Sequence, residues 1–152
     1  MIIHTEQDLK RSNIARLLNK YKNLNKRSVS VGIHKKDNKH YPNSKVTTAE
    51  VGLIHEFGGE IRTPRIWLRI FTMLNAERDD LLKQIEIALR ENDNIDKALD
   101  EIGAYMKDRI KDRILSNEVT PSSYNKSGIT LVDTGQLVNS IDYEVHWCLM
   151  TF

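Results

Sequence analysis

The sequence is poor in several features that would mark particular classes of protein. Cys148 is its one cysteine, which excludes an internal disulfide and a cysteine-ligated zinc site. No window approaches the roughly 18 consecutive apolar residues of a membrane span, and charged residues begin soon after the N-terminal MII. We therefore expect no signal peptide and no membrane partner, and a protein that is made in the cytoplasm.

A complete motif for binding phosphate is also missing. Gly58 and Gly59 are followed by Glu60 and Ile61, whereas a phosphate loop continues with Lys and Ser or Thr at the start of a helix. The stretch HEFGG begins like the His-Glu-x-x-His pattern of zinc proteases, but Gly59 stands where the second histidine belongs. We interpret His55, the first residue of this stretch, as a helix-surface or interface residue.

The other histidines show no spacing typical of metal ligands. They are His4, His34, His40 and His146. His34 and His40 flank a lysine-rich loop and could bind a metal adventitiously, although solvated loop residues are the better interpretation. The sequence predicts no metal site and no cofactor.

The triplet Asp133-Thr134-Gly135 matches the one with which aspartic proteases begin their active-site loop. That chemistry needs two carboxylates that share a proton, held in a chain rich in β-strands. Here the chain before Asp133 has mainly helical periodicity, and only 17 residues follow Gly135. We instead expect Asp133 to cap a short helix over residues 134–140 that buries Leu137, and we expect no enzyme.

Charge is divided unevenly along the chain. Residues 1–46 hold 11 Lys and Arg against 3 Asp and Glu, a charge of +8, and residues 47–152 hold 12 against 18, a charge of −6. Such a molecule could meet nucleic acid with its basic end, or another copy of itself with both ends. The lysines of the polar stretch 34–46 could contact a DNA backbone, and the alternative is that this stretch is simply a solvated loop.

The first half of the chain reads as helix, strand, loop and helix. Residues 5–24 carry an apolar stripe at helical spacing, and residues 27–33 alternate valine and isoleucine with serine and glycine as a strand does. Residues 34–46 are polar and predict a mobile loop. Thr47 and Glu50 then form a capping box for a helix that ends at Gly58.

The second half predicts a long helical hairpin and a closing strand. One helix is expected over residues 66–90 and another over 92–117, because apolar residues recur there at helical spacing. A second mobile loop covers about 118–130, and residues 142–147 alternate as a strand. The expected fold is therefore α+β, a single domain over 1–152 with three to five mainly antiparallel strands backed by long helices.

Three separated segments together resemble one family. They are NKRSVSVGI, TTAEVGLIHEFGGEIRTPRIWLR and LVDTGQLVNSIDYEV, and in this order they are similar to the tail-completion and neck proteins of long-tailed bacteriophages, also called phage virion morphogenesis or minor tail component proteins. The residues that match the family pattern are Ala49, His55, Glu56, Phe57, Gly58, Pro64, Arg65, Leu68, Arg69, Leu131, Asp133, Thr134, Gly135, Leu137, Ser140 and Ile141. Thr63 replaces the usual isoleucine, and Trp67 the usual phenylalanine.

The resemblance implies a non-enzymatic structural protein of the virion, located at the head-to-tail junction. It implies assembly as a homo-oligomeric ring around the DNA channel, with the connector or head-completion proteins and the tail tube or terminator proteins as partners, and with non-specific contact to the genomic DNA. Its motif residues are then expected to have structural roles; they include His55, Phe57, Gly58, Pro64, Asp133, Thr134, Gly135 and Leu137.

Residue type and charge also suggest which residues would lie at an interface between copies. Arginine and tryptophan are favoured at interface hot spots, and a basic edge can meet an acidic edge. The candidate interface residues are Lys35, Lys36, Lys39, Arg65, Trp67 and Arg69. For Trp67 a place in the core is an equal alternative, as is plain solvation for the two arginines.

Other functions remain open from the sequence. A small DNA-binding protein could use the basic segment 1–46, and a tail terminator or head-completion protein would perform a neighbouring role with a similar small fold. A hydrolase would rest on the Asp133-Thr134-Gly135 triplet alone.

Overall fold

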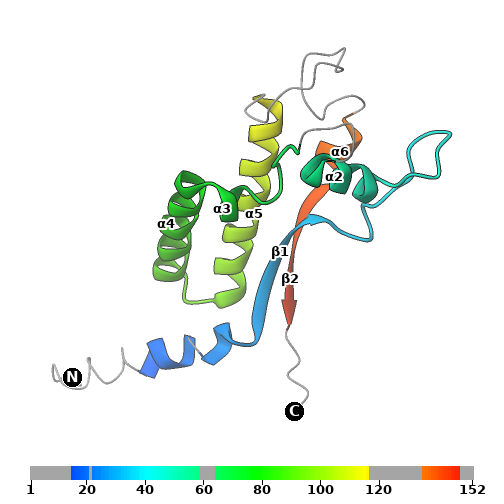
Figure 1. Cartoon of the computed structure of the whole chain (residues 1–152). Coiled ribbons are helices and arrows are strands. Elements are labelled where there is room, and N and C mark those ends of the chain that lie inside the picture. Colours follow the sequence, from blue (N-terminus) through cyan, green and yellow to red (C-terminus); the bar gives the residue numbers. More distant parts are fainter. Residues whose placement is uncertain (1–14, 21, 59–63, 117–134, 148–152) are drawn as a thin grey trace, which may run out of the picture.

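The computed structural model describes residues 15–20, 22–58, 64–116 and 135–147 (Figure 1). Within these ranges the chain is an α+β structure with an antiparallel sheet and several helices, as the sequence predicts. The elements are β1 (Arg27–Ile33), α2 (Thr48–Phe57), α3 (Ile70–Met73), α4 (Asn75–Glu91), α5 (Ile95–Leu115), α6 (Gln136–Asn139) and β2 (Ile141–Trp147). None of the helices in the described ranges is long and apolar enough to span a bilayer.

The sheet is a ribbon made from the two ends of the described chain. β1 and β2 pair in antiparallel fashion, with Val29 opposite Val145 and Ile33 opposite Ile141. Both strands occur where alternating residues predict them. The described part of the chain has two strands rather than the expected three to five, because its other apolar residues recur at helical spacing.

Helix α5 lies along one face of this ribbon, and α4 packs on α5 as the expected helical hairpin (Figure 1). α5 begins after Asn94, whose side chain accepts hydrogen bonds from the amides of Asp96 and Lys97. Gly103 lets the helix approach the ribbon closely, because a Cβ there would lie 2.3 Å from Cδ2 of Tyr143. The hairpin therefore packs closely against the strands at this point.

Two groups of buried side chains form the core. One lies between the hairpin and β1, and its buried members are Ala88, Ile95, Ala98, Leu99 and Ile102. The other joins the hairpin to the short helices and the start of β2, and its buried members are Trp67, Ile70, Phe71, Ile110, Ile114, Leu137, Val138 and Ile141. The expected burial of Leu137 is confirmed, and Val138 and Ile141 are buried beside it.

The expectation of one helix over 66–90 is wrong. Residues 66–69 are not helical, α3 is a single turn, and Leu74 has extended dihedrals (φ −112°, ψ 117°) before α4 begins. Pro64 also lies in irregular backbone and does not open a helix. Periodicity misses these breaks because apolar side chains keep their spacing while the backbone of 67–69 bonds elsewhere, as described below.

Segment 34–46 is bonded to the start of α2 at Asn38 and Lys39, and the mobility expected of it stays a prediction. The carbonyl of Lys39 accepts from the amide and the hydroxyl of Thr48, at 2.8 and 2.9 Å. The side chain of Asn38 accepts from the amide of Ala49 at 2.9 Å. The second expected loop, 118–130, lies outside the described residues. The first predicted helix is observed as helical backbone at 15–20 and 22–24.

A buried carboxylate links the helices of the hairpin. Glu77 of α4 is 5% exposed and bonds to Arg109 and Arg113 of α5. Hydrogen bonds from Arg109, helped by Arg113 and opposed by burial, hold the pKa of Glu77 below its ordinary 4.5. Folding thus favours the ionised carboxylate of Glu77. Its bonds to Arg109 and Arg113 contribute stability only while Glu77 is charged.

Replacing Gly103 with alanine should destabilise the fold. The new Cβ would overlap the base of the Tyr143 ring and lie 2.9 Å from Cγ2 of Val29, and overpacking of this kind costs about 1–3 kcal/mol. Urea denaturation followed by circular dichroism measures the change in free energy of unfolding. The same substitution in a Tyr143→Ala background is the control and should cost less. An unchanged or raised midpoint in the wild-type background would contradict the close approach.

Stability should fall as the pH drops below about 4.5, in part through Glu77. Because the pKa of Glu77 is lower in the folded than in the unfolded chain, its contribution is complete above the unfolded value and disappears as pH falls through the folded value. Urea denaturation from pH 7 to pH 3 compares wild type with Glu77→Gln. The variant should lose about 2 kcal/mol at pH 7 and show a shallower acid dependence. Parallel curves would show that Glu77 contributes nothing to the acid sensitivity.

Candidate functional site

The segments that carry the family resemblance pack against one another. Gly52 of α2 is the meeting point, because a Cβ there would lie 3.0 Å from the Trp67 ring and 3.3 Å from Leu137 of α6. The indole Nε1 of Trp67 donates to the Gly52 carbonyl at 3.0 Å. The side chain of Gln136 bonds to the Thr48 hydroxyl at 2.7 Å, so α6 also contacts the start of α2. We call α2, residues 64–69 and α6 the motif unit.

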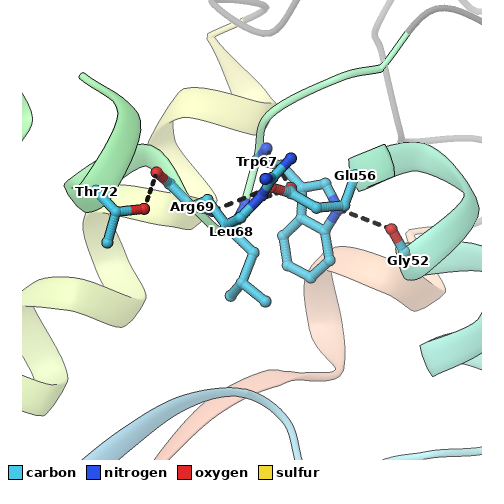
Figure 2. A network of polar contacts seen from close by, with 6 residues as sticks. All are labelled: Gly52, Glu56, Trp67, Leu68, Arg69 and Thr72. Atoms are coloured by element: carbon cyan, nitrogen blue, oxygen red, sulfur yellow. Dashed lines mark hydrogen bonds and ion pairs between the residues drawn. The ribbon is translucent and has the colours of Figure 1, made fainter. Parts of the chain in front are cut away.

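Glu56 is the centre of this unit (Figure 2). It is 1% exposed, and its carboxylate accepts from the backbone amides of Trp67 at 2.8 Å and Leu68 at 2.9 Å. Arg69 donates to it from its amide at 3.3 Å and from Nε at 2.7 Å. The carboxylate thus takes the amides that a helix over 66–69 would leave unpaired at its start, and a buried charge is fully engaged.

The neighbours of Glu56 in the HEFG stretch attach the same two segments. The carbonyl of His55 accepts from the Arg65 amide at 2.7 Å, and its ring Nδ1 lies 3.3 Å from the Arg65 guanidinium. Phe57 lies beneath the Arg69 guanidinium, 4.4 Å from the ring centre. His55 and Phe57 therefore attach α2 to residues 64–69, which is a structural role of the kind expected of them.

The ends of α2 largely follow the sequence. Thr47 and Glu50 form the expected capping box, with the Glu50 carboxylate 2.7 Å from the Thr47 amide. Gly58 ends the helix with φ 75° and ψ −164°. Its φ favours glycine, although its ψ lies outside the left-handed helical region that was expected.

Helix α6 begins later than expected. It covers Gln136–Asn139, and its N-cap is Gly135 in the left-handed conformation (φ 70°) with no capping side chain. The N-cap position is therefore not that of Asp133, which was expected to fill it. Asp133 and Thr134 lie outside the described residues, so the capping bond stays a prediction. Glycine at 135 is required by its positive φ rather than by tight packing.

The candidate interface residues from the sequence lie in different environments. Trp67 is 2% exposed and belongs to the core, so the alternative of a core position holds and not that of an interface residue. Arg65 is 9% exposed and pairs with His55, and Arg69 is partly exposed but bonded to Glu56. Lys36 forms ion pairs with Asp142 and Glu144 of the same chain. Hydrogen bonds to these two carboxylates, that to Asp142 first, raise the pKa of Lys36 above its ordinary value. Lys35 and Lys39 belong to the same polar segment.

Several cations of the basic segment have partners in the same chain. Arg16 lies 3.6 Å from Asp93, and Arg27 bonds to Asp96. Lys20 donates to the carbonyls of Leu89 and Asn92. They line a polar cleft of about 490 Å³ between the N-terminal helical residues and the α4–α5 turn. Part of the charge asymmetry seen in the sequence is thus neutralised inside one molecule.

An exposed apolar surface lies on the motif unit instead. Leu53, Ile54 and Phe57 occupy one side of α2 and are 56%, 45% and 57% exposed. Their spacing of one and three residues places them together on the helix face away from Gly52. We call this the α2 face. Apolar residues at helical spacing do not show by themselves whether a helix face is buried in the chain or left at the surface.

Comparison of the chain with protein-family models, curated proteins and solved structures found no match to any of them. The resemblance to phage tail-completion and neck proteins therefore rests on the residues of the three segments.

Replacing Glu56 with glutamine should destabilise the motif unit strongly. The amide nitrogen of glutamine cannot accept hydrogen bonds, and Arg69 would lose a charged partner, so the free energy of unfolding should fall by about 3 kcal/mol. Urea denaturation provides the measurement. Glu86→Gln is the matched control, because its pair with Arg90 is exposed and should contribute at most about 0.5 kcal/mol. Equal losses in the two variants would refute the central place of Glu56.

Proposed function

We propose that this protein is a structural component of a phage head-to-tail junction, of the tail-completion or neck type, that assembles as a ring of identical copies. The packing of the second and third resembling segments into one unit is the observation that carries the proposal. In that unit His55, Glu56 and Arg69 hold backbone and side chains together. Motif residues used in this way support a role as a scaffold for assembly rather than catalysis.

The α2 face is the contact that we assign to the neighbouring copy. It is apolar and belongs to the motif unit, and a contact between two different faces of identical subunits closes into a ring when the rotation allows. Burial of the exposed halves of Leu53, Ile54 and Phe57 would contribute about 1 kcal/mol each. This is enough to orient neighbouring copies, while further contacts are needed for a stable ring.

Charge has a smaller part in this proposal than the sequence suggested. Arg16, Arg27 and Lys36 already pair with acidic residues of their own chain. The pairs of Arg16 and Lys36 are exposed and therefore weak, so they could exchange partners between copies. The same pairing reduces the case for direct DNA binding through the basic segment. Contacts with connector, head-completion, tube or terminator proteins belong to the proposal through the resemblance alone.

The purified full chain should form one discrete large oligomer. Light scattering after size exclusion and negative-stain electron microscopy measure its mass and shape. Leu53→Asp and Ile54→Asp should each shift the protein to monomer, because each places a charge in the apolar contact. Leu82→Asp on α4 is the matched control, since Leu82 is also 56% exposed and lies outside the motif unit.

Two results would overturn the proposal. A strict monomer at high concentration would count against a ring, as would an oligomer that survives both substitutions on the α2 face. Salt-dependent binding of duplex DNA by that monomer would favour the alternative of a small DNA-binding protein. A ring that forms as expected would still leave neck, terminator and head-completion proteins to be separated by their binding partners.

A further inference from the structure

The face of the ribbon opposite α5 carries polar residues. Val29 and Val145 point toward the hairpin, and residues one position along each strand point the other way. Ser30 lies opposite Glu144 on this second face, and His146 is the next residue of β2 on the same side. His34 follows directly after β1.

Both histidines direct a ring nitrogen to the same serine. Nε2 of His34 lies 3.0 Å from the Ser30 hydroxyl, and Nε2 of His146 lies 2.7 Å from it. Glu144 Oε2 is 4.0 Å from Nε2 of His146. One donor atom from each of His34, Glu144 and His146 can be chosen so that all three lie within 4.8 Å of one another.

We propose that His34, Glu144 and His146 form a binding site for a divalent transition-metal ion, with zinc as the best match. Two imidazoles and one carboxylate are a ligand set that zinc accepts, and three protein ligands leave a fourth position for water. With bonds of about 2.1 Å, tetrahedral ligand atoms lie about 3.4 Å apart. The ligand atoms of the cluster, which lie within 4.8 Å of one another, would therefore have to draw closer by side-chain rotation when an ion binds.

The surroundings of these ligands fit the proposal. The other carboxylate oxygen of Glu144, Oε1, lies 3.4 Å from the ammonium of Lys36, which leaves Oε2 directed to the histidines. Metal-bound carboxylates are commonly oriented by such an outer partner. Lys36 also has Asp142 at 3.2 Å, so a neighbouring acid balances its charge near the ion.

His34 supplies a second observation. Its Nδ1 is buried, and among the residues that the structure describes it has no hydrogen-bond partner. Buried polar atoms without partners are uncommon, and a bound ion is one way in which they are satisfied.

A bound ion would join the two strands through side chains as well as through backbone bonds. His34 comes from the chain leaving β1, whereas Glu144 and His146 belong to β2. The ion would therefore fix segment 34–46 relative to the ribbon. This inference is independent of the proposed assembly role, because the site lies on the ribbon and not on the α2 face.

Zinc titration of the full chain tests the site. The protein, free of any histidine tag and treated with chelator, is titrated with zinc chloride in competition with a chromophoric chelator, and cobalt is used for visible spectroscopy. We expect one equivalent to bind at micromolar concentration or below and the melting temperature to rise. His146→Ala and Glu144→Gln should each weaken binding by about tenfold or more.

His40→Ala is the matched control, because His40 is exposed and bonds to the Lys45 carbonyl away from the cluster. Its affinity for zinc should equal that of wild type. His146 and Glu144 are partly exposed, so their variants should fold, which circular dichroism verifies. The proposal is overturned by the absence of binding at micromolar zinc, by binding that survives both cluster substitutions, or by equal loss in His40→Ala.

Discussion

The buried carboxylate of Glu56 is the interaction on which the arrangement of this chain depends. It binds the backbone amides of three consecutive residues, 67 to 69, and therefore fixes the path of this stretch beside α2. With the backbone held there, the Trp67 ring enters the core against Gly52 and α3 starts at Ile70. A charge without water is stable only when its partners are complete, so α2 and the core are specified together.

Much of the fold follows from local pattern. Both strands, the helical hairpin, the capping box at Thr47 and the burial of Leu137 agree with expectation, because each depends on side-chain spacing within a single element. Local pattern fails for the expected helix 66–90. Residues 66–69 lie beside α2 with the amides of 67–69 bonded to Glu56, and Leu74 is extended before α4 begins. Side-chain spacing records neither feature.

The candidate sites divide in the same way. The resemblance singles out the residues of the HEFG stretch. The bonds that Glu56 and His55 make with residues 65–69 are visible only in the structure. The sequence left Trp67 open between an interface and the core, and its burial decides for the core. The histidine cluster could not be found by spacing, since His34 and His146 are brought together by pairing of β1 with β2. An antiparallel ribbon creates neighbours that no linear motif contains.

That ribbon also sets an order on folding. β1 lies near the start of the described chain and β2 near its end, so their hydrogen bonds close a loop that contains nearly every other element. Contacts between α4 and α5 are local and form at a lower entropic cost. The hairpin is therefore the part of the described chain whose contacts can form with the least loss of chain entropy. The pairing of β1 with β2 depends on the two strands that lie farthest apart in the described sequence.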